Sequence, residues 1–440
     1  MPNYRLVVVV VMMLLLVLSI SSHYIPISDA QSLPMKINWR VYSSAGDIDS
    51  YAYSVCDAGD YIYVVGEKGK YTTYARVEMR SKQDGSLVKD WNSKDPSGQY
   101  GFYTSYDCVI AEDRLYVVSP GFSILVFDLN LNMLKSIRRE INGQPNSIIY
   151  YANNLYIAGV EYSKSGDSWW RVEKWNAKDL KIIKEYTSNP TPVFDFAESI
   201  GINPVTEQLW AVGHVNFGET SGTSRVEILD LDLNLIKIIN SNFELSYITF
   251  DKKGYAYISG IGIAKYNKYG EEIAKKDFPF VGKLLYVNDY LYAVTHYIEN
   301  DIHNLLVFDT ELNLVDRIVL SENDTVGRFT SGKMSFDGRN LYIAGYGKRK
   351  YGDLYWKWVI YSISVSPEEP GTVTKTTETT LPPTTLTNTT QATTVETSAT
   401  TLTITKSLTP GRDNMTMLIL IAIVAVIAII TAVVILAIRK

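Results

Sequence analysis

A seven-residue pattern recurs seven times along this chain and constrains the fold more than any other feature. Residues 153–159 read Asn-Asn-Leu-Tyr-Ile-Ala-Gly: a polar turn leads into an aromatic and β-branched segment that ends at a small residue. Segments of this kind favour half-buried strands. The pattern occupies residues 60–66, 113–119, 153–159, 207–213, 254–260, 289–295 and 339–345. The chain is therefore built from one repeated structural unit.

Each copy of the pattern lies among other short apolar segments. One segment precedes it, as at residues 146–151, and two follow, as at 170–175 and 180–183. The repeat length averages about 46 residues, and four short antiparallel strands at that spacing are typical of a propeller blade. The sequence predicts an all-β fold, a seven-bladed β-propeller of four-stranded antiparallel blades. Six or eight blades are the alternatives if one divergent repeat is miscounted.

The seventh repeat supplies three strands, near residues 333–336, 340–345 and 356–365, before the composition changes. The missing fourth strand is expected from the other end of the propeller. Residues 36–42 alternate between polar and apolar and precede the first repeat. If this N-terminal strand joins the last blade, the ring closes without an exposed sheet edge.

The two ends of the chain predict a membrane-anchored surface protein. Residues 1–30 have the features of a secretory signal peptide, with an uncleaved anchor as the alternative. Residues 415–438 contain an uncharged apolar run long enough to span a bilayer as one helix, and a basic pair at 439–440 predicts a cytoplasmic end. We therefore expect a single-pass protein of the cell membrane. Its predicted parts are a signal peptide (1–30), a propeller (36–366), a stalk (367–414), a transmembrane helix (415–438) and a cytoplasmic tail (439–440).

The predicted stalk is rich in Thr and Pro and has almost no aromatic residues. Such a segment buries too little apolar surface to fold, and its composition is typical of glycosylated, extracellular stalks. Asn388 lies in an N-glycosylation sequon within the stalk, and Asn323 lies in another within the propeller. Both are candidate glycosylation sites.

Composition narrows the classes of function. A net charge of −5 argues against a nucleic-acid-binding surface. With two Cys and four His, no Cys/His metal site is expected, and no cofactor motif is present. We interpret His214, His296 and His303 as solvated loop residues.

Cys56 and Cys108 occupy similar places in the innermost strands of neighbouring repeats, so either a disulfide or two buried thiols is expected.

The connections of an antiparallel meander divide into two faces. Turns between first and second strands, and between third and fourth strands, share one end of the propeller. There Asp128, Asp230 and Asp309 are interpreted as turn-forming residues. The opposite connections are long and unlike one another, which favours a binding face. The candidate ligand-binding residues on this long-loop face are Tyr71, Tyr74, Trp169, Trp170, Phe217, Tyr297, Tyr351, Tyr355 and Trp356.

Two further expectations concern this face. Strand alternation predicts that one Trp of each neighbouring Trp pair packs between blades while the other faces outward. Four charged residues are expected near the mouth of the central channel, where they could hold a cation, act as acid and base, or simply cap strands. These candidates are Asp107, Asp195, Glu198 and Arg328.

Residues 36–365 resemble the broad β-propeller group that includes quinoprotein-like, kelch and WD-repeat proteins. Residues 84–91, which end at Trp91, look like the Asp- and Trp-containing element of quinoprotein blades, whereas residues 267–270 lack the Trp. With its signal, stalk and anchor, the whole chain resembles an archaeal cell-surface protein.

A surface-anchored binding or adhesion protein for an extracellular glycan or protein is the first functional expectation. The stalk is expected to leave from the short-turn end, because the last strand of the seventh repeat runs toward it, so the long-loop face would point away from the membrane. An extracellular enzyme, either a hydrolase or a quinoprotein-type oxidoreductase, is one alternative. A structural partner in a surface layer is another.

Overall fold

The computed structural model describes residues 35–44, 46, 48–69, 73–93, 104–191, 194–217, 223–278, 281–297, 302–320, 325–328, 332–349 and 354–365. The predicted signal peptide, stalk, transmembrane helix and both glycosylation sites lie outside these residues. A search of the described part finds no helix that is long and apolar enough to span a membrane.

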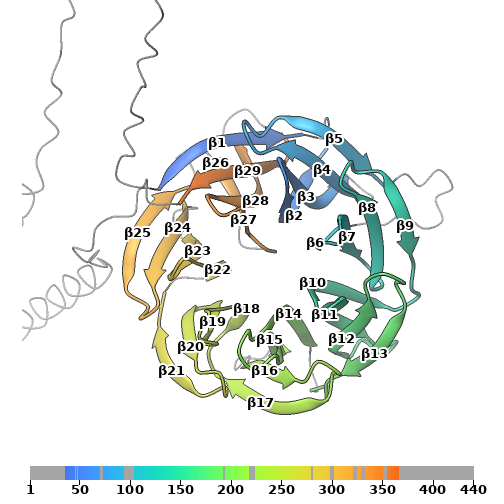
Figure 1. Cartoon of the computed structure of the whole chain (residues 1–440), viewed down its shortest axis with the longest axis vertical. Coiled ribbons are helices and arrows are strands. Elements are labelled where there is room, and N and C mark those ends of the chain that lie inside the picture. Colours follow the sequence, from blue (N-terminus) through green and yellow to red (C-terminus); the bar gives the residue numbers. More distant parts are fainter. Residues whose placement is uncertain are drawn as a thin grey trace, which may run out of the picture. The chain divides into compact units, whose positions relative to one another are not determined.

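Seven antiparallel sheets form a closed ring, and each sheet follows the previous one along the chain (Figure 1). Blade one contains β2 (Ser50–Ala58), β3 (Tyr61–Gly69), β4 (Thr73–Ser81) and β5 (Leu87–Asn92). Blade two contains β6 (Asp107–Ala111), β7 (Arg114–Ser119), β8 (Ser123–Asp128) and β9 (Met133–Ile137). Blade three contains β10 (Gly143–Tyr151), β11 (Asn154–Tyr162), β12 (Ser168–Asn176) and β13 (Ile182–Thr187).

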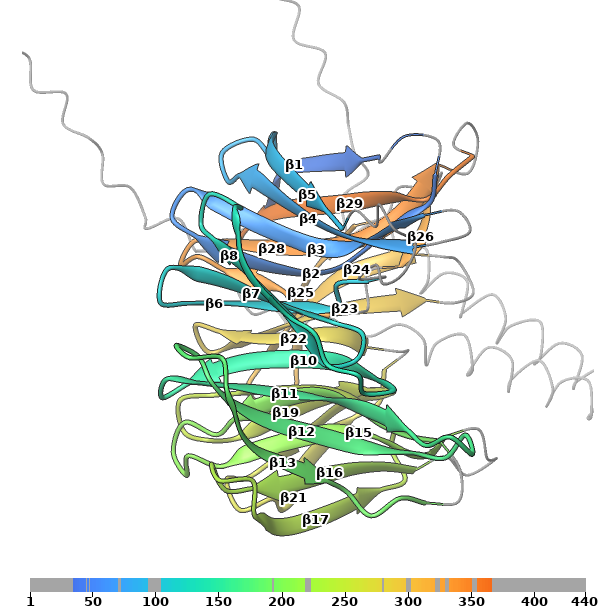
Figure 2. The same cartoon turned by 90° about the vertical axis from the view of Figure 1, so that its right-hand side faces the viewer.

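The next three blades have the same four-stranded order from the channel outward, and Figure 2 shows the ring from the side. Blade four contains β14 (Phe194–Ile202), β15 (Leu209–Phe217), β16 (Thr223–Leu229) and β17 (Leu235–Ser241). Blade five contains β18 (Leu245–Phe250), β19 (Ala256–Gly260), β20 (Gly262–Tyr266) and β21 (Glu272–Lys276). Blade six contains β22 (Val281–Val287), β23 (Tyr290–Tyr297), β24 (Ile302–Asp309) and β25 (Leu314–Val319). The predicted seven-bladed propeller is confirmed.

The seventh blade is assembled from both ends of the propeller, as the sequence predicts. β1 (Lys36–Ser43) pairs antiparallel with β29 (Lys357–Ser364), from Lys36 opposite Ser364 to Ser43 opposite Trp358. β29 in turn pairs with β28 (Asn340–Arg349). The innermost strand of this blade is divided into β26 (Thr325–Arg328) and β27 (Ser335–Phe336), which pair with opposite ends of β28. The sequence predicted one strand here, near residues 333–336.

The recurrent Tyr of the repeat holds neighbouring blades together. In five blades, the Tyr hydroxyl of the second strand donates a hydrogen bond to a backbone carbonyl near the end of the third strand of the next blade. The oxygen–oxygen distance is 3.1 Å from Tyr116 to Ala177 and 3.1 Å from Tyr156 to Leu231. Because each ring is fully or nearly fully buried, the hydroxyl needs such a partner. The same bond is made by Tyr63, Tyr257 and Tyr292.

The recurrent Gly that ends the repeat allows a bulge in the innermost strand. In blades one, three, four and five, the register of this strand shifts beside the Gly. A Cβ added to Gly159 would overlap the carbonyl oxygen of Gln144, and Gly66, Gly213 and Gly260 are crowded in the same way. In blade two, Ser119 replaces the Gly and β6 pairs with β7 without a register shift. In these four blades the Gly makes room for an extra residue next to the channel, whereas blade six has a register shift beside Thr295.

The turns between third and fourth strands depend on Asp side chains. The Oδ1 atom of Asp128 accepts hydrogen bonds from the backbone N–H of Asn130, at 3.0 Å, and of Asn132, at 2.7 Å. Leu131 between them has a φ of 57° and is 1% exposed. Asp230 and Asp309 make equivalent bonds, which confirms their interpretation as turn-forming residues.

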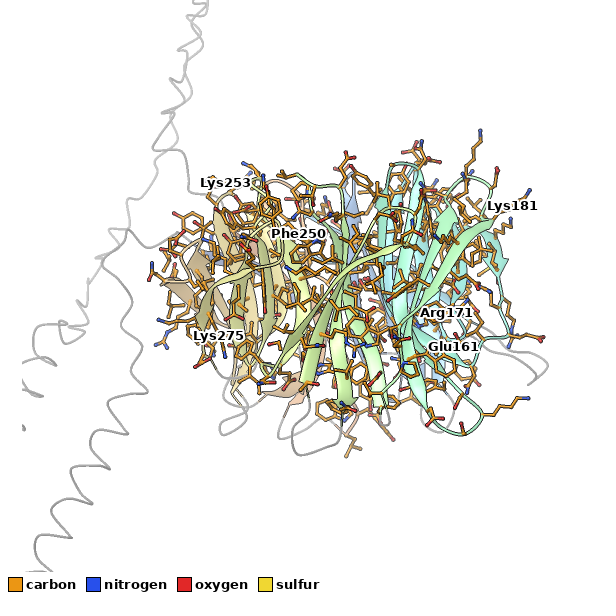
Figure 3. The ribbon with its side chains drawn as sticks, turned by 90° about the horizontal axis from the view of Figure 1, so that it is seen from below. Glu161, Arg171, Lys181, Phe250, Lys253 and Lys275 are labelled. Carbon is orange, nitrogen blue, oxygen red and sulfur yellow. A yellow bond between two sulfur atoms is a disulfide. The ribbon has the colours of Figure 1, made fainter. Side chains whose placement is uncertain are left out.

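Both ends of the described propeller lie on the short-turn face. The N–H of Val365, the last described residue, donates to the carbonyl of Arg339 in the turn before β28. Lys36 lies opposite Ser364 on the neighbouring strand. Figure 3 shows the propeller edge-on, with Lys181 and Lys253 near the short-turn face and Glu161 nearer the opposite, long-loop face.

Candidate functional site

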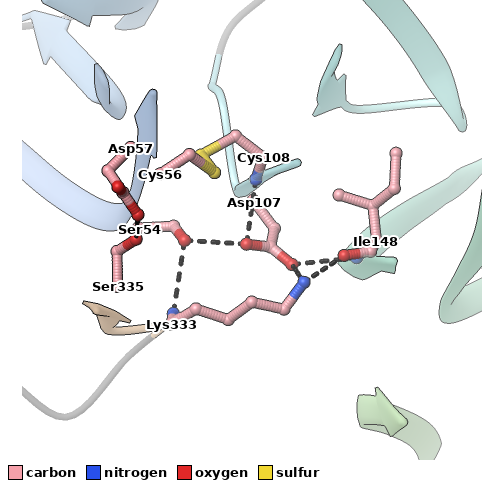
Figure 4. The surroundings of a disulfide bond; sticks show 8 residues. All are labelled: Ser54, Cys56, Asp57, Asp107, Cys108, Ile148, Lys333 and Ser335. Carbon is pink, nitrogen blue, oxygen red and sulfur yellow. Dashed lines mark hydrogen bonds and ion pairs between the residues drawn. A yellow bond between two sulfur atoms is a disulfide. The ribbon is translucent and has the colours of Figure 1, made fainter. Parts of the chain in front are cut away.

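Asp107 lies at the centre of a hydrogen-bond network that crosses the channel (Figure 4). Its carboxylate accepts hydrogen bonds from the Ser54 hydroxyl at 2.7 Å, its neighbour Cys108 N–H at 2.9 Å and the Ile148 N–H at 2.8 Å. Lys333 reaches it from blade seven, with Nζ 2.6 Å from Oδ2. Asp107 is 1% exposed. Its bonds to Ser54, Ile148 and Lys333 join blade two to blades one, three and seven.

The break between β26 and β27 is what places Lys333 inside the ring. The N–H of Gly332 donates to the Tyr247 hydroxyl, at 3.3 Å, and the N–H of Lys333 donates to the Ser54 hydroxyl, also at 3.3 Å. Residues 332–334 therefore contact the innermost strands of other blades and occupy part of the channel.

A disulfide joins the first two blades beside this network. Cys56 and Cys108 lie on β2 and β6, and their Cα atoms are 6.2 Å apart. Both are buried among apolar side chains of the two blades. Of the two alternatives that the sequence left open, the structure therefore has the disulfide.

A second cation, Lys283, is buried near the channel on β22. It is 1% exposed, and its Nζ donates to the backbone carbonyls of Tyr53, at 2.9 Å, and Ala344. Burial lowers the pKa of Lys283 from 10.5 to about 7, and the negative charge of Asp107 opposes this shift. This lysine links blade six to blades one and seven.

A cavity of about 350 Å³ lies where the channel opens toward the short-turn face. It is lined mainly by apolar side chains of blades three to six, including Ile149, Ile248, Phe250 and Leu285, and by residues 332–334. The charged candidates Asp107, Asp195 and Glu198 do not line it.

The long-loop face differs from the sequence expectation, because its connections are mostly extended hairpins. The ladder of β11 and β12 continues to Tyr162 opposite Ser168, and that of β23 and β24 continues to Tyr297 opposite Ile302. Tyr74, Trp169, Trp170 and Phe217 consequently lie on strands. Hairpins hold side chains more rigidly than free loops do, which suits a binding surface.

The Trp alternation predicted from the sequence is confirmed. Trp170 is fully buried and its Nε1 donates to the His214 carbonyl at 3.0 Å, whereas Trp169 is half-buried. Trp358 is likewise fully buried, whereas Trp356 is half-buried. Trp170 must therefore be removed from the candidate ligand-binding residues, because neighbouring blades cover it.

The remaining loop-face candidates divide into three groups. Tyr74, Tyr355 and Trp356 are half-buried, and Phe217 is 50% exposed. Tyr297 is placed on β23 by its backbone. Tyr71 and Tyr351 lie outside the described residues.

Sequence reasoning missed a further set of aromatic residues on this face. They lie at the beginnings of innermost strands or on β11 and β28, and not in the connections themselves. Tyr51 and Tyr346 meet edge-to-face with ring centroids 4.8 Å apart, and Tyr162 stacks on Phe194 at 5.6 Å. In the sequence, aromatic residues alternate with other residues in Tyr51-Ala-Tyr53 and Phe194-Asp-Phe196, and this pattern could have predicted that the aromatic side chains share one face of a strand. The missed residues are Tyr51, Tyr53, Tyr106, Tyr162, Phe194, Phe196 and Tyr346.

The charged candidates differ in their surroundings. Asp195 is fully buried and fixes a connection: its carboxylate accepts the N–H of Thr191, at 2.8 Å, and of Asn216, at 2.9 Å. Arg328 lies on β26, and its side chain is not described. Among the described residues, no three His, Cys, Asp or Glu side chains lie close enough to hold a metal ion.

Glu198 remains as the charged candidate with a distinctive environment. It is the extra residue of the β14 bulge and keeps part of its surface exposed. Burial, with a smaller contribution from the negative charge of Glu244 on the next blade, raises the pKa of Glu198 from 4.5 to about 7. Burial also raises the pKa of Glu244.

Three rings of blade four contact one another on the long-loop face. The ring of Phe196 lies 4.9 Å from that of His214 and 5.2 Å from that of Phe217. His214 Nε2 lies 3.4 Å from the Ser246 hydroxyl on blade five.

The interpretation of the histidines as solvated loop residues was wrong for two of them. His214 is 6% exposed on β15, and burial lowers its pKa to about 4, so it is neutral at pH 7. His303 is fully buried on β24. Both belong to hairpin strands that extend beyond the expected length. The His296 side chain is not described.

Comparison with known proteins identifies the fold. No family model and no curated protein matches the chain. Among solved structures, the Neurospora crassa Pan2 WD40 domain aligns with a TM-score of 0.53 and 10% identity, over 76% of this chain and 97% of that domain. A chain of a mitotic checkpoint complex aligns with a TM-score of 0.53 and 12% identity, over 77% and 98%. At such identities the likeness concerns the fold alone, and the chain is similar to WD40-type β-propellers.

Proposed function

We propose that this chain is a cell-surface binding protein that presents the long-loop face of its propeller to an extracellular protein. The observation that carries the proposal is the distribution of features between the two faces. The described chain enters and leaves on the short-turn face, beside Lys36 and Val365. Exposed and half-buried aromatic residues gather on the opposite face.

The predicted signal, stalk and C-terminal anchor support a cell-surface location of the kind seen in archaeal surface proteins. An anchor attached on the short-turn side would hold the long-loop face away from the membrane. The channel interior is less suited to a ligand, because Lys333 crosses it to reach Asp107. A protein partner is favoured because Phe217 is 50% exposed and Leu354 is 84% exposed, and apolar groups of this kind enter protein interfaces.

The test uses the full-length chain displayed on cells, with its extracellular location checked by removal of the propeller by an added protease. Arrays of extracellular proteins and of glycans are then probed with the chain, with the double variant Phe217→Ser/Leu354→Ser and with Tyr269→Ser. Tyr269 is a matched control because it is 63% exposed in a turn of the short-turn face.

Binding to a protein that falls at least about tenfold in the double variant, and persists in Tyr269→Ser, is the expected result. The proposal is wrong if binding depends on Tyr269 instead, or if the propeller resists protease on intact cells and is cleaved after lysis. Binding confined to the glycan array would replace the protein partner by a glycan.

A further inference from the structure

Blades one and three carry the same buried ion pair on their third strands. Glu78 and Glu173 are fully buried, and the arginines two residues before them, Arg76 and Arg171, each contact the glutamate. Both arginines lie directly opposite the Gly that ends the repeat on the second strand. The surroundings of the two arginines can therefore be compared position by position.

In blade three, carboxylates surround the arginine on all sides. The Nε of Arg171 lies 2.6 Å from Glu173, its Nη1 lies 2.8 Å from Glu161, and its Nη2 lies 2.6 Å from Glu185. The side chains of Arg171 and Glu161, from neighbouring strands, are labelled in Figure 3. Each nitrogen of this guanidinium group has an acceptor, as a buried cation requires.

In blade one, the corresponding arginine lacks two of these acceptors. The Nη2 of Arg76 contacts Glu78 and donates to the Ser43 hydroxyl at 3.3 Å. Within the described part of the chain, its Nε and Nη1 are buried without a hydrogen-bond acceptor, and the whole residue is 4% exposed. Buried donors without an acceptor are rare in native proteins and are commonly satisfied by a water molecule or an ion.

The position of Glu161 has the opposite charge in blade one. Lys68 lies diagonally across from Arg76, as Glu161 does from Arg171. Lys68 is half-buried; burial and then the positive charge of Arg76 lower its pKa, and Asp90 on β5 opposes this shift. Two cations are therefore neighbours where blade three has an ion pair. A water molecule accepts hydrogen bonds without offsetting this charge, whereas an anion does both.

We propose that Arg76 and Lys68 bind a small free oxyanion, of the size of a carboxylate or phosphate, where the N-terminal strand closes the ring. Ser43 ends β1, and the guanidinium carbon of Arg76 lies 4.9 Å from the centre of the Trp358 ring on β29. Guanidinium and ammonium groups are well suited to oxyanions. The donors of Arg76 are enclosed, which favours a free anion over a side chain of a protein partner. The inference is thus independent of the proposed function.

The first experiment measures binding of sodium acetate and of sodium phosphate to the full-length chain by isothermal titration calorimetry, with the ionic strength held constant by sodium chloride. The variants are Lys68→Glu, which places a carboxylate where blade three has one, and Lys68→Gln, which removes only the charge. Lys164→Glu is the control, because Lys164 is exposed in the turn between β11 and β12 and its substitution changes the net charge equally. Circular dichroism verifies that each variant is folded.

We expect at least one of the two anions to bind the wild type. Binding should weaken at least about tenfold in Lys68→Glu, because the new carboxylate accepts the hydrogen bonds of Arg76. Lys68→Gln should also weaken binding, and it provides the answer if Lys68→Glu does not fold. The inference is wrong if neither anion binds the wild type, or if the Lys68 variants bind as tightly as the control.

Urea unfolding with and without phosphate provides a second measurement. A ligand that binds only the folded state raises the unfolding midpoint. Because phosphate stabilises folded proteins in general, the informative quantity is the difference between variants. The midpoint should rise more in the wild type and in Lys164→Glu than in Lys68→Glu, and without phosphate Lys68→Glu should be the most stable of the three. An equal rise in all three proteins would overturn the inference.

Discussion

At the scale of single residues, the repeat can now be explained position by position. The Tyr supplies a hydroxyl that reaches the next blade, as from Tyr156 to Leu231. The Gly leaves room for a carbonyl oxygen of the bulged inner strand, as at Gly159. The first polar residue of the pattern belongs to the turn before the strand, where Ala152 and Asn153 have φ values of 46° and 62°. Each part of the pattern is therefore structural, and the candidate binding residues lie outside it.

Glu198 provides a prediction about pH at this scale. Its folded-state pKa of about 7 exceeds the ordinary value of 4.5, so the folded state binds more protons between these two values. Stability should therefore fall as pH rises through this window. Glu198→Gln removes the titrating group and should stabilise the protein by about 1–2 kcal/mol at pH 8, since partial exposure reduces the full effect.

Urea unfolding at pH 4 and pH 8 checks this prediction. The variant and the wild type should have nearly the same free energy of unfolding at pH 4 and should differ at pH 8. Glu140→Gln serves as the exposed control and should give the same difference from wild type at both pH values. A destabilised Glu198→Gln variant at pH 8 would mean that the carboxylate has a stabilising partner.

At the scale of strands, bulges decide what faces the channel. Four innermost strands carry an extra residue beside a Gly of the repeat, and in blade four that residue is Glu198. In blade seven the inner strand is interrupted between β26 and β27, and Lys333 in this interruption lies inside the ring. Regular strands would give seven equivalent inner surfaces, and these irregularities make the blades chemically different.

Gly159→Ala tests the link between the repeat and the bulge. The new Cβ would overlap the carbonyl oxygen of Gln144, which is backbone and cannot rotate away. We expect a loss of about 3 kcal/mol in the free energy of unfolding, measured in urea. Gly166→Ala is the control: nothing lies within 4 Å of its added Cβ, although its φ of 99° strains an alanine, so a loss of about 1 kcal/mol is expected. Equal losses in the two variants would contradict the steric explanation.

At the scale of the whole molecule, closure of the ring depends on contacts between segments far apart in sequence. β1 completes the last blade by pairing with β29, although the two strands begin 321 residues apart in the sequence. Lys283 links blade six to blades one and seven, and Asp107 on blade two receives contacts from three other blades. The disulfide adds a covalent link between blades one and two across a sequence separation of 52 residues.

Cys56→Ser/Cys108→Ser measures the contribution of that link. A loop of this length predicts a loss of about 4 kcal/mol in the chain-entropy account. Urea unfolding without reductant should show this loss, and wild-type protein that is unfolded with reductant should match the variant. If the variant is as stable as the oxidised wild type, the disulfide contributes nothing to the stability of the ring.

The sequence by itself determined the architecture, because a repeated turn, Tyr-containing strand and Gly leave few ways to bury their apolar faces. It also predicted closure by residues 36–42 and the turn role of Asp128. Only the tertiary structure decided which candidates meet. Trp170 and Asp195 are buried by neighbouring blades, whereas Phe196 and Phe217 come together from β14 and β15. Bulge positions and strand breaks depend on how blades pack, and a local sequence pattern carries no record of the residues that lie across the channel.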